Sequence, residues 1–204
     1  LKRRLEWRGY TVELLDYNPG DTFPKNVDII VGGGGQDSGQ DKIQQDLQKI
    51  GPALKQLADE DVPMLMICGL YQLFGKFFKT RQGEIIQGIG LFDIETYGGD
   101  TRMIGNIVTT SETFGEIIGY ENHSGVTTLS AMAKPFGLVR CGAGNNNKDR
   151  TEGVIYNNVI GTYLHGSLLP KNPKIADFLI TNAVKNKFNE PLPPLNQTDS
   201  YTEK

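Results

Sequence analysis

The sequence predicts an α/β domain with a mostly parallel, open sheet flanked by helices and a second half rich in short strands. Two apolar segments, Val27–Val31 and Met64–Ile67, each end in a glycine-containing turn. Between them, Gln40–Asp61 carries apolar residues at steps of three and four, which indicates an amphipathic helix. Strands that alternate with helices pair in parallel, and helices cover the sheet. We therefore expect functional turns at the carboxyl ends of the strands.

The first half is predicted to alternate between helices and strands. Before the long helix we expect a short helix near Leu1–Arg8 and strands over Thr11–Leu15 and Val27–Val31. Pro52 should kink or restart the long helix, because proline lacks the amide hydrogen that the helix uses. After Met64–Ile67, another helix is expected to continue to about Lys79.

The second half changes character after Arg81, where glycine and asparagine turns separate short apolar segments. The expected strands are Ile89–Tyr97, Met103–Thr109, Ile117–Glu121, Phe136–Arg140, Gly153–Tyr156 and Val159–Leu164. A helix over Asn172–Phe188 closes a single predicted domain, residues 1–188. Residues 189–204 are proline-rich and then polar, and we expect a disordered tail there.

Composition excludes several functional classes. The 204 residues carry a net charge of −3 without a basic block, which argues against a nucleic-acid partner. No apolar run approaches the ~18 residues of a membrane span and no signal peptide is evident, so we expect a cytoplasmic protein without membrane insertion. The two cysteines, Cys68 and Cys141, do not indicate a disulfide framework, and Cys141 is expected to be a core thiol. No Cys/His spacing predicts a metal site.

Cys68 is the candidate nucleophile. It stands between an apolar strand and a predicted helix that begins at Gly69, where the helix dipole and unpaired N–H groups favour a thiolate. The alternative is an inert buried cysteine, which is common in βα units. The run Gly32–Gly35 fits neither of the glycine-rich nucleotide-binding patterns. An N–H group from Gly33 or Gly34 could instead join that of Gly69 in an oxyanion hole.

His165 is the candidate base. The predicted strand Val159–Leu164 ends directly before it, so a parallel strand would deliver its imidazole to the edge of the sheet that holds Cys68. A single histidine is more often structural than catalytic. However, a cysteine at a strand end, a glycine loop and a late histidine together favour a cysteine nucleophile with its base.

Four segments resemble motifs of the cobyric-acid-synthase-like glutamine amidotransferases: Val31–Asp37, Ile67–Gln72, Gly119–Gly125 and Gly161–Gly166. The match is strongest to the glutaminase subunits of lipid II isoglutaminyl synthases, to which Gly142–Asn147 and His165–Asn172 are also similar. The resemblance extends to about Lys187. It implies a flavodoxin-like fold of class I glutamine amidotransferases, and a first strand that precedes Leu1.

The resemblance also assigns roles in the hydrolysis of L-glutamine. Cys68 would be the nucleophile and His165 the base, with Gly34 and Gly69 as oxyanion donors. Arg102 would bind the substrate α-carboxylate, for which a planar cation is suited. Gln72, one helical turn after Cys68, would help to hold the substrate. Surface positions are the alternatives for Arg102 and Gln72, and His123, within the run Tyr120–Gly125, is expected to be structural.

Two positions depart from the family pattern. Leu70 occupies the place of a second glycine and narrows the turn after Cys68. Ser167 stands two residues after His165, where many enzymes of this chemistry place a carboxylate. The acid that orients His165 would then be Glu121, or an acid supplied by a partner subunit; we favour the partner.

The acceptor chemistry is expected on another chain, because this sequence has no Walker loop for ATP. The resemblance implies a Mur-ligase-like synthetase subunit that binds ATP and Mg²⁺ and amidates the D-glutamate α-carboxylate of lipid II. No cofactor is expected on this chain. Amidation of a corrinoid ring is one alternative function. A binding subunit without catalysis is another, if Leu70 disables the site.

Overall fold

The computed structural model describes residues 1–33 and 40–195, and a four-stranded sheet lies at its centre. Its order is β1-β2-β10-β9. Three strands are parallel: β1 (Ile30–Gly32), β2 (Met64–Ile67) and β10 (Val159–Thr162). The edge strand β9 (Val154–Tyr156) is antiparallel to β10. The predicted mostly parallel sheet is therefore confirmed.

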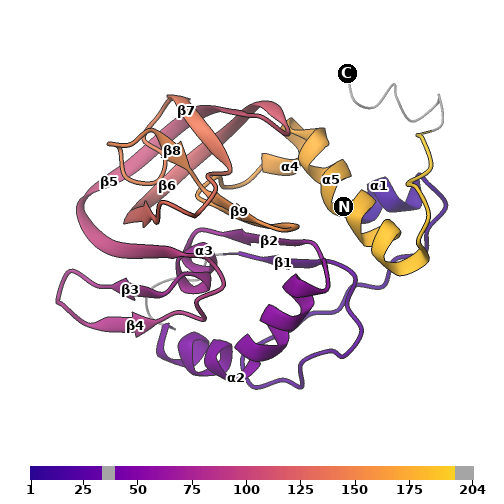
Figure 1. Ribbon diagram of the computed structural model, residues 1–204, viewed down its shortest axis with the longest axis horizontal. Coiled ribbons are helices and arrows are strands. Elements are labelled where there is room, and N and C mark those ends of the chain that lie inside the picture. Colours follow the sequence, from indigo (N-terminus) through magenta and orange to yellow (C-terminus); the bar gives the residue numbers. More distant parts are fainter. Residues whose placement is uncertain (34–39, 196–204) are drawn as a thin grey trace.

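The two faces of this sheet are covered by different layers (Figure 1). In β2, Met64 and Met66 pack with the apolar face of α2 (Gln40–Asp59). Leu65 points to the opposite face, where it packs with α5 (Pro173–Phe188) and with the second sheet. This alternation is the period-two pattern of a strand that is buried on both faces.

The second sheet is antiparallel except where β3 pairs with β5. Its order is β4 (Ile85–Gln87), β3 (Phe77–Lys79), β5 (Ile94–Ser111), β7 (Gly137–Cys141) and β8 (Thr151–Glu152). The long strand β6 (Gly115–Leu129) pairs with β5 along most of its length. The predicted β-rich second half therefore divides between the two sheets, because β9 and β10 join the parallel sheet and the other strands form a second sheet that packs on it.

Asn172, between α4 (Leu168–Lys171) and α5, fastens β6 to the helical layer. Its Oδ1 accepts the N–H of Ile118 at 2.9 Å, and its Nδ2 donates to the carbonyl of Ile118 at 2.8 Å. The side chain therefore pairs with β6 as a neighbouring strand would. Because β6 also carries Glu121, Asn122 and His123, this contact fixes one wall of the candidate site.

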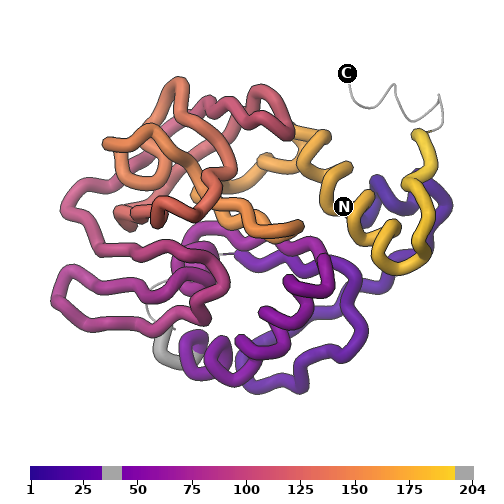
Figure 2. The backbone as a smooth tube through the Cα atoms, viewed as in Figure 1, coloured from indigo at the N-terminus to yellow at the C-terminus, as the bar shows by residue number. Residues whose placement is uncertain are grey.

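The first and last helices lie side by side (Figure 2). Arg4 and Arg8, in or just after α1 (Lys2–Glu6), both contact Asp177 of α5, at 2.7 Å and 3.0 Å. Leu5 packs beneath them against Ile180 and Val184. Within the described residues, no helix is both long enough and apolar enough to cross a bilayer.

The prediction of a strand over Thr11–Leu15 is wrong. These residues form no regular element, and Leu14 and Leu15 are exposed. Of the neighbouring segment Val27–Val31, only its last two residues join β1. An alternating pattern becomes a strand only when another strand supplies its backbone hydrogen bonds, and β1 is the edge of the described sheet.

Other element boundaries also differ. The helix after Cys68, α3 (Gly69–Phe74), ends before the predicted Lys79, because the backbone becomes extended at Gly75 and Phe77–Lys79 forms β3. The strand expected from Ile89 begins only at Ile94. Helix α2 continues through Pro52, and Cys141 is exposed at the end of β7 rather than in the core.

Candidate active site

Cys68 occupies a strained position between β2 and α3. Its φ of 56° and ψ of −110° lie in a region that residues with a Cβ rarely adopt. Two backbone hydrogen bonds hold this conformation: its N–H donates to the Thr162 carbonyl at 2.9 Å, and its carbonyl accepts the N–H of Gln72 at 3.1 Å. A strained residue between a buried strand and a helix is the geometry of a nucleophile elbow. Cys68 therefore remains the predicted nucleophile.

Leu70 is accommodated by a glycine on the neighbouring strand. A Cβ at Gly32 would collide with Cδ1 of Leu70 and lie 3.0 Å from Met66 Sδ. The side chain thus fills space that Gly32, at the end of β1, leaves open. Helix α3 still begins at Gly69, as the predicted elbow requires. Gly34, the second predicted oxyanion donor, lies outside the described residues.

His165 reaches the same edge of the sheet through β10. The register pairs Thr162 with Ile67, so the chain leaves β10 beside Cys68. The N–H of His165 donates to the Tyr120 carbonyl of β6 at 2.8 Å. Its Nε2 atom is buried and has no hydrogen-bond partner among the described residues. An unpartnered imidazole nitrogen is available to accept a proton.

Burial lowers the pKa of His165, which is half-buried. The Asn122 backbone partly offsets this by hydrogen bonding to the charged ring, and the positive charge of Arg102 lowers the pKa further. The ring is therefore neutral at neutral pH, which is the state that a general base requires.

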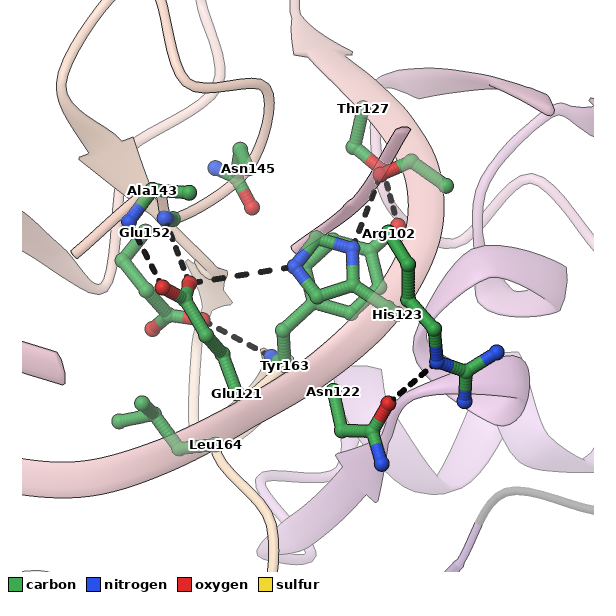
Figure 3. Close-up of polar contacts among 12 residues, drawn as sticks. Arg102, Glu121, Asn122, His123, Thr127, Ala143, Asn145, Glu152, Tyr163 and Leu164 are labelled. Carbon is green, nitrogen blue, oxygen red and sulfur yellow. Dashed lines mark hydrogen bonds and ion pairs between the residues drawn. The ribbon is translucent and has the colours of Figure 1, made fainter. Parts of the chain in front are cut away.

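Arg102 lies at an irregularity in the pairing of β5 with β6, between Gly98 and Met103. Its Nε donates to the Asn122 side chain at 2.6 Å, as Figure 3 shows. The two terminal nitrogens of the guanidinium, its fork, make no hydrogen bond with the described residues. They can therefore donate a pair of hydrogen bonds to a carboxylate. Bulges next to active sites commonly redirect a side chain in this way. The predicted role in substrate binding is compatible with this geometry.

The carboxylate of Glu121 contacts backbone N–H groups and not His165. Its two carboxylate oxygens accept the N–H groups of Ala143 and Gly144, at 2.7 Å and 2.8 Å (Figure 3). It also lies 4.0 Å from Nε2 of His123. No contact of the described residues joins Glu121 to His165. Among the described residues, the Asn122 backbone supports the His165 ring instead.

His123 is enclosed in the core of the site. Its ring stacks on that of Tyr163, with centroids 3.5 Å apart and planes 3° from parallel. Its Nδ1 is 2.9 Å from the Gly125 carbonyl. Burial lowers the pKa of His123 to about 4, so the ring is neutral at physiological pH. These contacts favour the structural role predicted for it.

The sequence reasoning missed a buried polar network behind the two catalytic candidates. Glu152 is fully buried and accepts the Tyr163 N–H at 2.8 Å and the Thr162 hydroxyl at 3.0 Å. Burial raises the pKa of Glu152 to about 7, and hydrogen bonds from Tyr163 and Thr162 oppose this rise. Nothing in the local run Thr-Glu-Gly distinguishes Glu152 from a surface glutamate. Its burial follows from the pairing of β8 with β7 and from its contacts with Thr162 and Tyr163.

Gln72 belongs to this network, because its Nε2 donates to the Tyr163 hydroxyl at 3.1 Å. It is buried, not the surface residue of the alternative interpretation.

Within the described part of the chain, no cluster of His, Cys, Asp and Glu side chains is arranged to hold a metal ion.

The site thus combines a strained cysteine, a neutral histidine and an arginine with a free fork at one edge of a parallel sheet. Residues 1–173 match the CobB/CobQ-like glutamine amidotransferase domain. The chain belongs to this family. It is 40% identical over 189 residues to subunit GatD of lipid II isoglutaminyl synthase (glutamine-hydrolyzing) from Staphylococcus aureus (strain N315), covering 92% of this chain and 76% of that protein.

Three further proteins extend the comparison. The GatD subunit of Streptococcus pneumoniae (strain ATCC BAA-255 / R6) is 38% identical over 183 residues, which are 88% of this chain and 70% of that one. A probable cobyric acid synthase of Methanococcus maripaludis (strain C6 / ATCC BAA-1332) is 31% identical over 72% of this chain but only 32% of its own length. A crystal structure of a glutamine amidotransferase has a TM-score of 0.59 at 13% identity, covering 78% of this chain and 80% of that chain. At that identity the likeness shows the fold alone.

We predict that His165→Ala lowers glutamine hydrolysis by about 10²–10⁴-fold, the usual effect of losing a positioned acid–base group. His123→Asn is the matched variant, because it keeps a polar side chain at the buried histidine. It should lower thermal stability and leave turnover closer to that of the parent. Glutamate release by the folded proteins is the measurement. A greater loss of turnover in His123→Asn would reverse the two roles.

Arg102 should affect substrate binding and the pH profile separately. Arg102→Lys keeps the charge but loses the fork, so the KM for glutamine should rise while the acid limb of kcat/KM stays in place. Arg102→Met also removes the charge that lowers the pKa of His165, so its acid limb should move to higher pH. Rates across pH at varied glutamine concentration test both. An unchanged KM in both variants would refute the assignment.

Proposed function

We propose that this chain is the glutaminase subunit of a two-subunit enzyme that amidates the α-carboxylate of D-glutamate in lipid II. It hydrolyses L-glutamine and supplies ammonia to the partner. The observation that carries the proposal is the elbow at Cys68, held by the carbonyl of Thr162 three residues before His165. The identity to two GatD subunits over most of this chain supports the choice of acceptor.

The chemistry follows from the charges at the sheet edge. The Cys68 thiolate attacks the carboxamide carbon of glutamine, and the N–H of Gly69 faces the developing oxyanion. His165 takes the thiol proton and returns it to the leaving nitrogen, which departs as ammonia and leaves a γ-glutamyl thioester. Water then attacks the thioester with His165 as base, and glutamate is released. The free fork of Arg102 holds the α-carboxylate throughout.

The partner is a Mur-ligase-like synthetase subunit that binds ATP and Mg²⁺, which activate the acceptor carboxylate. This chain supplies no cofactor of its own in the proposal. The outer face of β5 and β6, beside Arg102 and Asn122, exposes Ile104, Ile118 and Tyr120. Exposed apolar patches of this kind are typical of protein–protein interfaces. A partner on this face would cover the site from which ammonia leaves. We place this heterodimer in the cytoplasm, where ATP is available.

Two alternative functions compete with this proposal: amidation of a corrinoid ring, and a binding subunit without catalysis. Identity to GatD is 40% over 92% of this chain, against 31% over 72% for a probable cobyric acid synthase, which favours the lipid II acceptor. The accommodation of Leu70 by Gly32 favours catalysis over a disabled site. Incubating the complex with glutamine, ATP and either lipid II or a corrinoid acid decides the acceptor. Amidation of the corrinoid alone would overturn the proposal.

Cys68→Ala should abolish glutamine-dependent amidation by the complex and preserve amidation from added ammonium salt. The reason is that only the glutamine reaction needs the thioester. Cys141→Ser is the matched control, since it removes an exposed thiol of the same chain and should keep both activities. Loss of the ammonia-dependent reaction in Cys68→Ala, with the complex intact, would show that Cys68 is not confined to glutamine hydrolysis.

The missing carboxylate gives a further prediction. Because the Glu121 carboxylate is held by Ala143 and Gly144, the acid that orients His165 should come from the synthetase subunit. The isolated chain should then release ammonia slowly and accelerate when that subunit is added. Glu121→Gln should retain the acceleration, although it weakens the fold. Equal ammonia release with and without the partner, together with an inactive Glu121→Gln variant, would place the acid in this chain.

A further inference from the structure

Tyr163 connects the two elements that carry the catalytic candidates. It is fully buried two residues before His165, and its hydroxyl accepts a hydrogen bond from Nε2 of Gln72, one turn after Cys68. The same hydroxyl lies 2.6 Å from Thr127 Oγ1, which lies 2.8 Å from Thr96 Oγ1. The phenol oxygen accepts from Gln72, and either oxygen can be the donor between Tyr163 and Thr127. These hydrogen bonds connect Gln72 to the two long strands of the second sheet.

The ring of Tyr163 has little freedom to move. It stacks on His123 with centroids 3.5 Å apart, and it meets Tyr71 edge-on at 5.0 Å and 76°. Its backbone N–H is fixed by the buried carboxylate of Glu152 at 2.8 Å, and Figure 3 shows His123 and Glu152 beside Tyr163. The hydroxyl that meets Gln72 is thus held from several sides.

Gly125 leaves room for the hydrogen bond between Gln72 and Tyr163. A Cβ at this position would collide with Nε2 of Gln72 and lie 2.7 Å from the Tyr163 hydroxyl oxygen. The strand β6 therefore passes directly against the two bonded groups, and only a glycine permits this approach. The contact is therefore enclosed on the β6 side.

The other end of the Gln72 amide remains open. Its Oε1 makes no hydrogen bond with any described residue, and it is not among their buried polar atoms without a partner. An oxygen that has no hydrogen-bond partner and is not fully buried retains some exposure to solvent. Gln72 therefore presents its carbonyl oxygen, while its nitrogen is occupied by Tyr163.

We propose that Tyr163 is a positioning residue that fixes the Gln72 amide so that its carbonyl oxygen accepts a hydrogen bond from the substrate. This rests on the proposed hydrolysis of glutamine at Cys68. Glutamine offers N–H donors at its α-ammonium and carboxamide groups, and an acceptor facing them is complementary. With the amide reversed, an N–H group would face those donors and the hydrogen bond would be lost. The role concerns binding and not the transfer of a proton.

The test compares Tyr163→Phe with Tyr71→Phe in the two-subunit complex. Both changes remove one hydroxyl from a fully buried tyrosine, and the Tyr71 hydroxyl donates to Asn145, not to Gln72. Both should lower thermal stability. Only Tyr163→Phe should raise the KM for glutamine, by about 3- to 10-fold with kcat little changed, as expected for one net hydrogen bond. Equal KM values in the two variants would overturn the proposal.

A double-variant comparison separates positioning from general damage. In a Gln72→Ala background the amide is absent, so adding Tyr163→Phe should raise the KM no further. A full additional rise would show that Tyr163 acts independently of Gln72, against the proposal. The parent complex serves as the reference for the proposed function. If the parent complex releases no ammonia from glutamine, that function fails. If the parent is active and Tyr163→Phe has the same KM for glutamine, only this inference is refuted.

Discussion

The pairing of β2 with β10 is the constraint on which the site depends. Parallel strands point their carboxyl ends in one direction, and the register of Thr162 with Ile67 places both exits at one level. The Thr162 carbonyl accepts the N–H of Cys68, so the last hydrogen bond of the ladder also holds the nucleophile in its strained conformation. A slip in this register would move His165 away from Cys68 and would also break the hydrogen bond between Cys68 and Thr162, because the same pairing sets both positions.

Buried polar groups behind the ladder favour this register. Burial removes Glu152 from water, which raises its pKa and carries a free-energy cost. The cost is limited because its oxygens receive the Thr162 hydroxyl and the Tyr163 N–H. Replacing either donor would leave a carboxylate with fewer partners in the core. The network therefore favours one arrangement of the segment between β10 and His165 over alternatives of similar apolar burial.

The sequence predicts this structure well where local pattern and tertiary context agree. Met64–Ile67 is found at its predicted bounds, since four apolar residues before a cysteine and a glycine fit a buried strand and its turn. Thr11–Leu15 also has strand-like residues, but it pairs with no strand among the described residues, and local propensity alone does not form a ladder. The family and the elements that carry Cys68 and His165 were predictable from motifs. Glu152 and the Tyr163–Gln72 contact were not, because burial of polar groups depends on residues that are distant in sequence.

The support of His165 by a backbone group has a chemical consequence. When His165 accepts the thiol proton, a positive charge forms beside Arg102, which opposes it. The Asn122 backbone offers a dipole and not a full negative charge, and a carboxylate on the ring stabilises an imidazolium far better. Glu121 is held by Ala143 and Gly144, and Ser167 carries no charge. The described residues thus favour the neutral ring and disfavour its protonated form, so a carboxylate brought by another chain would change the rate more than it changes the geometry.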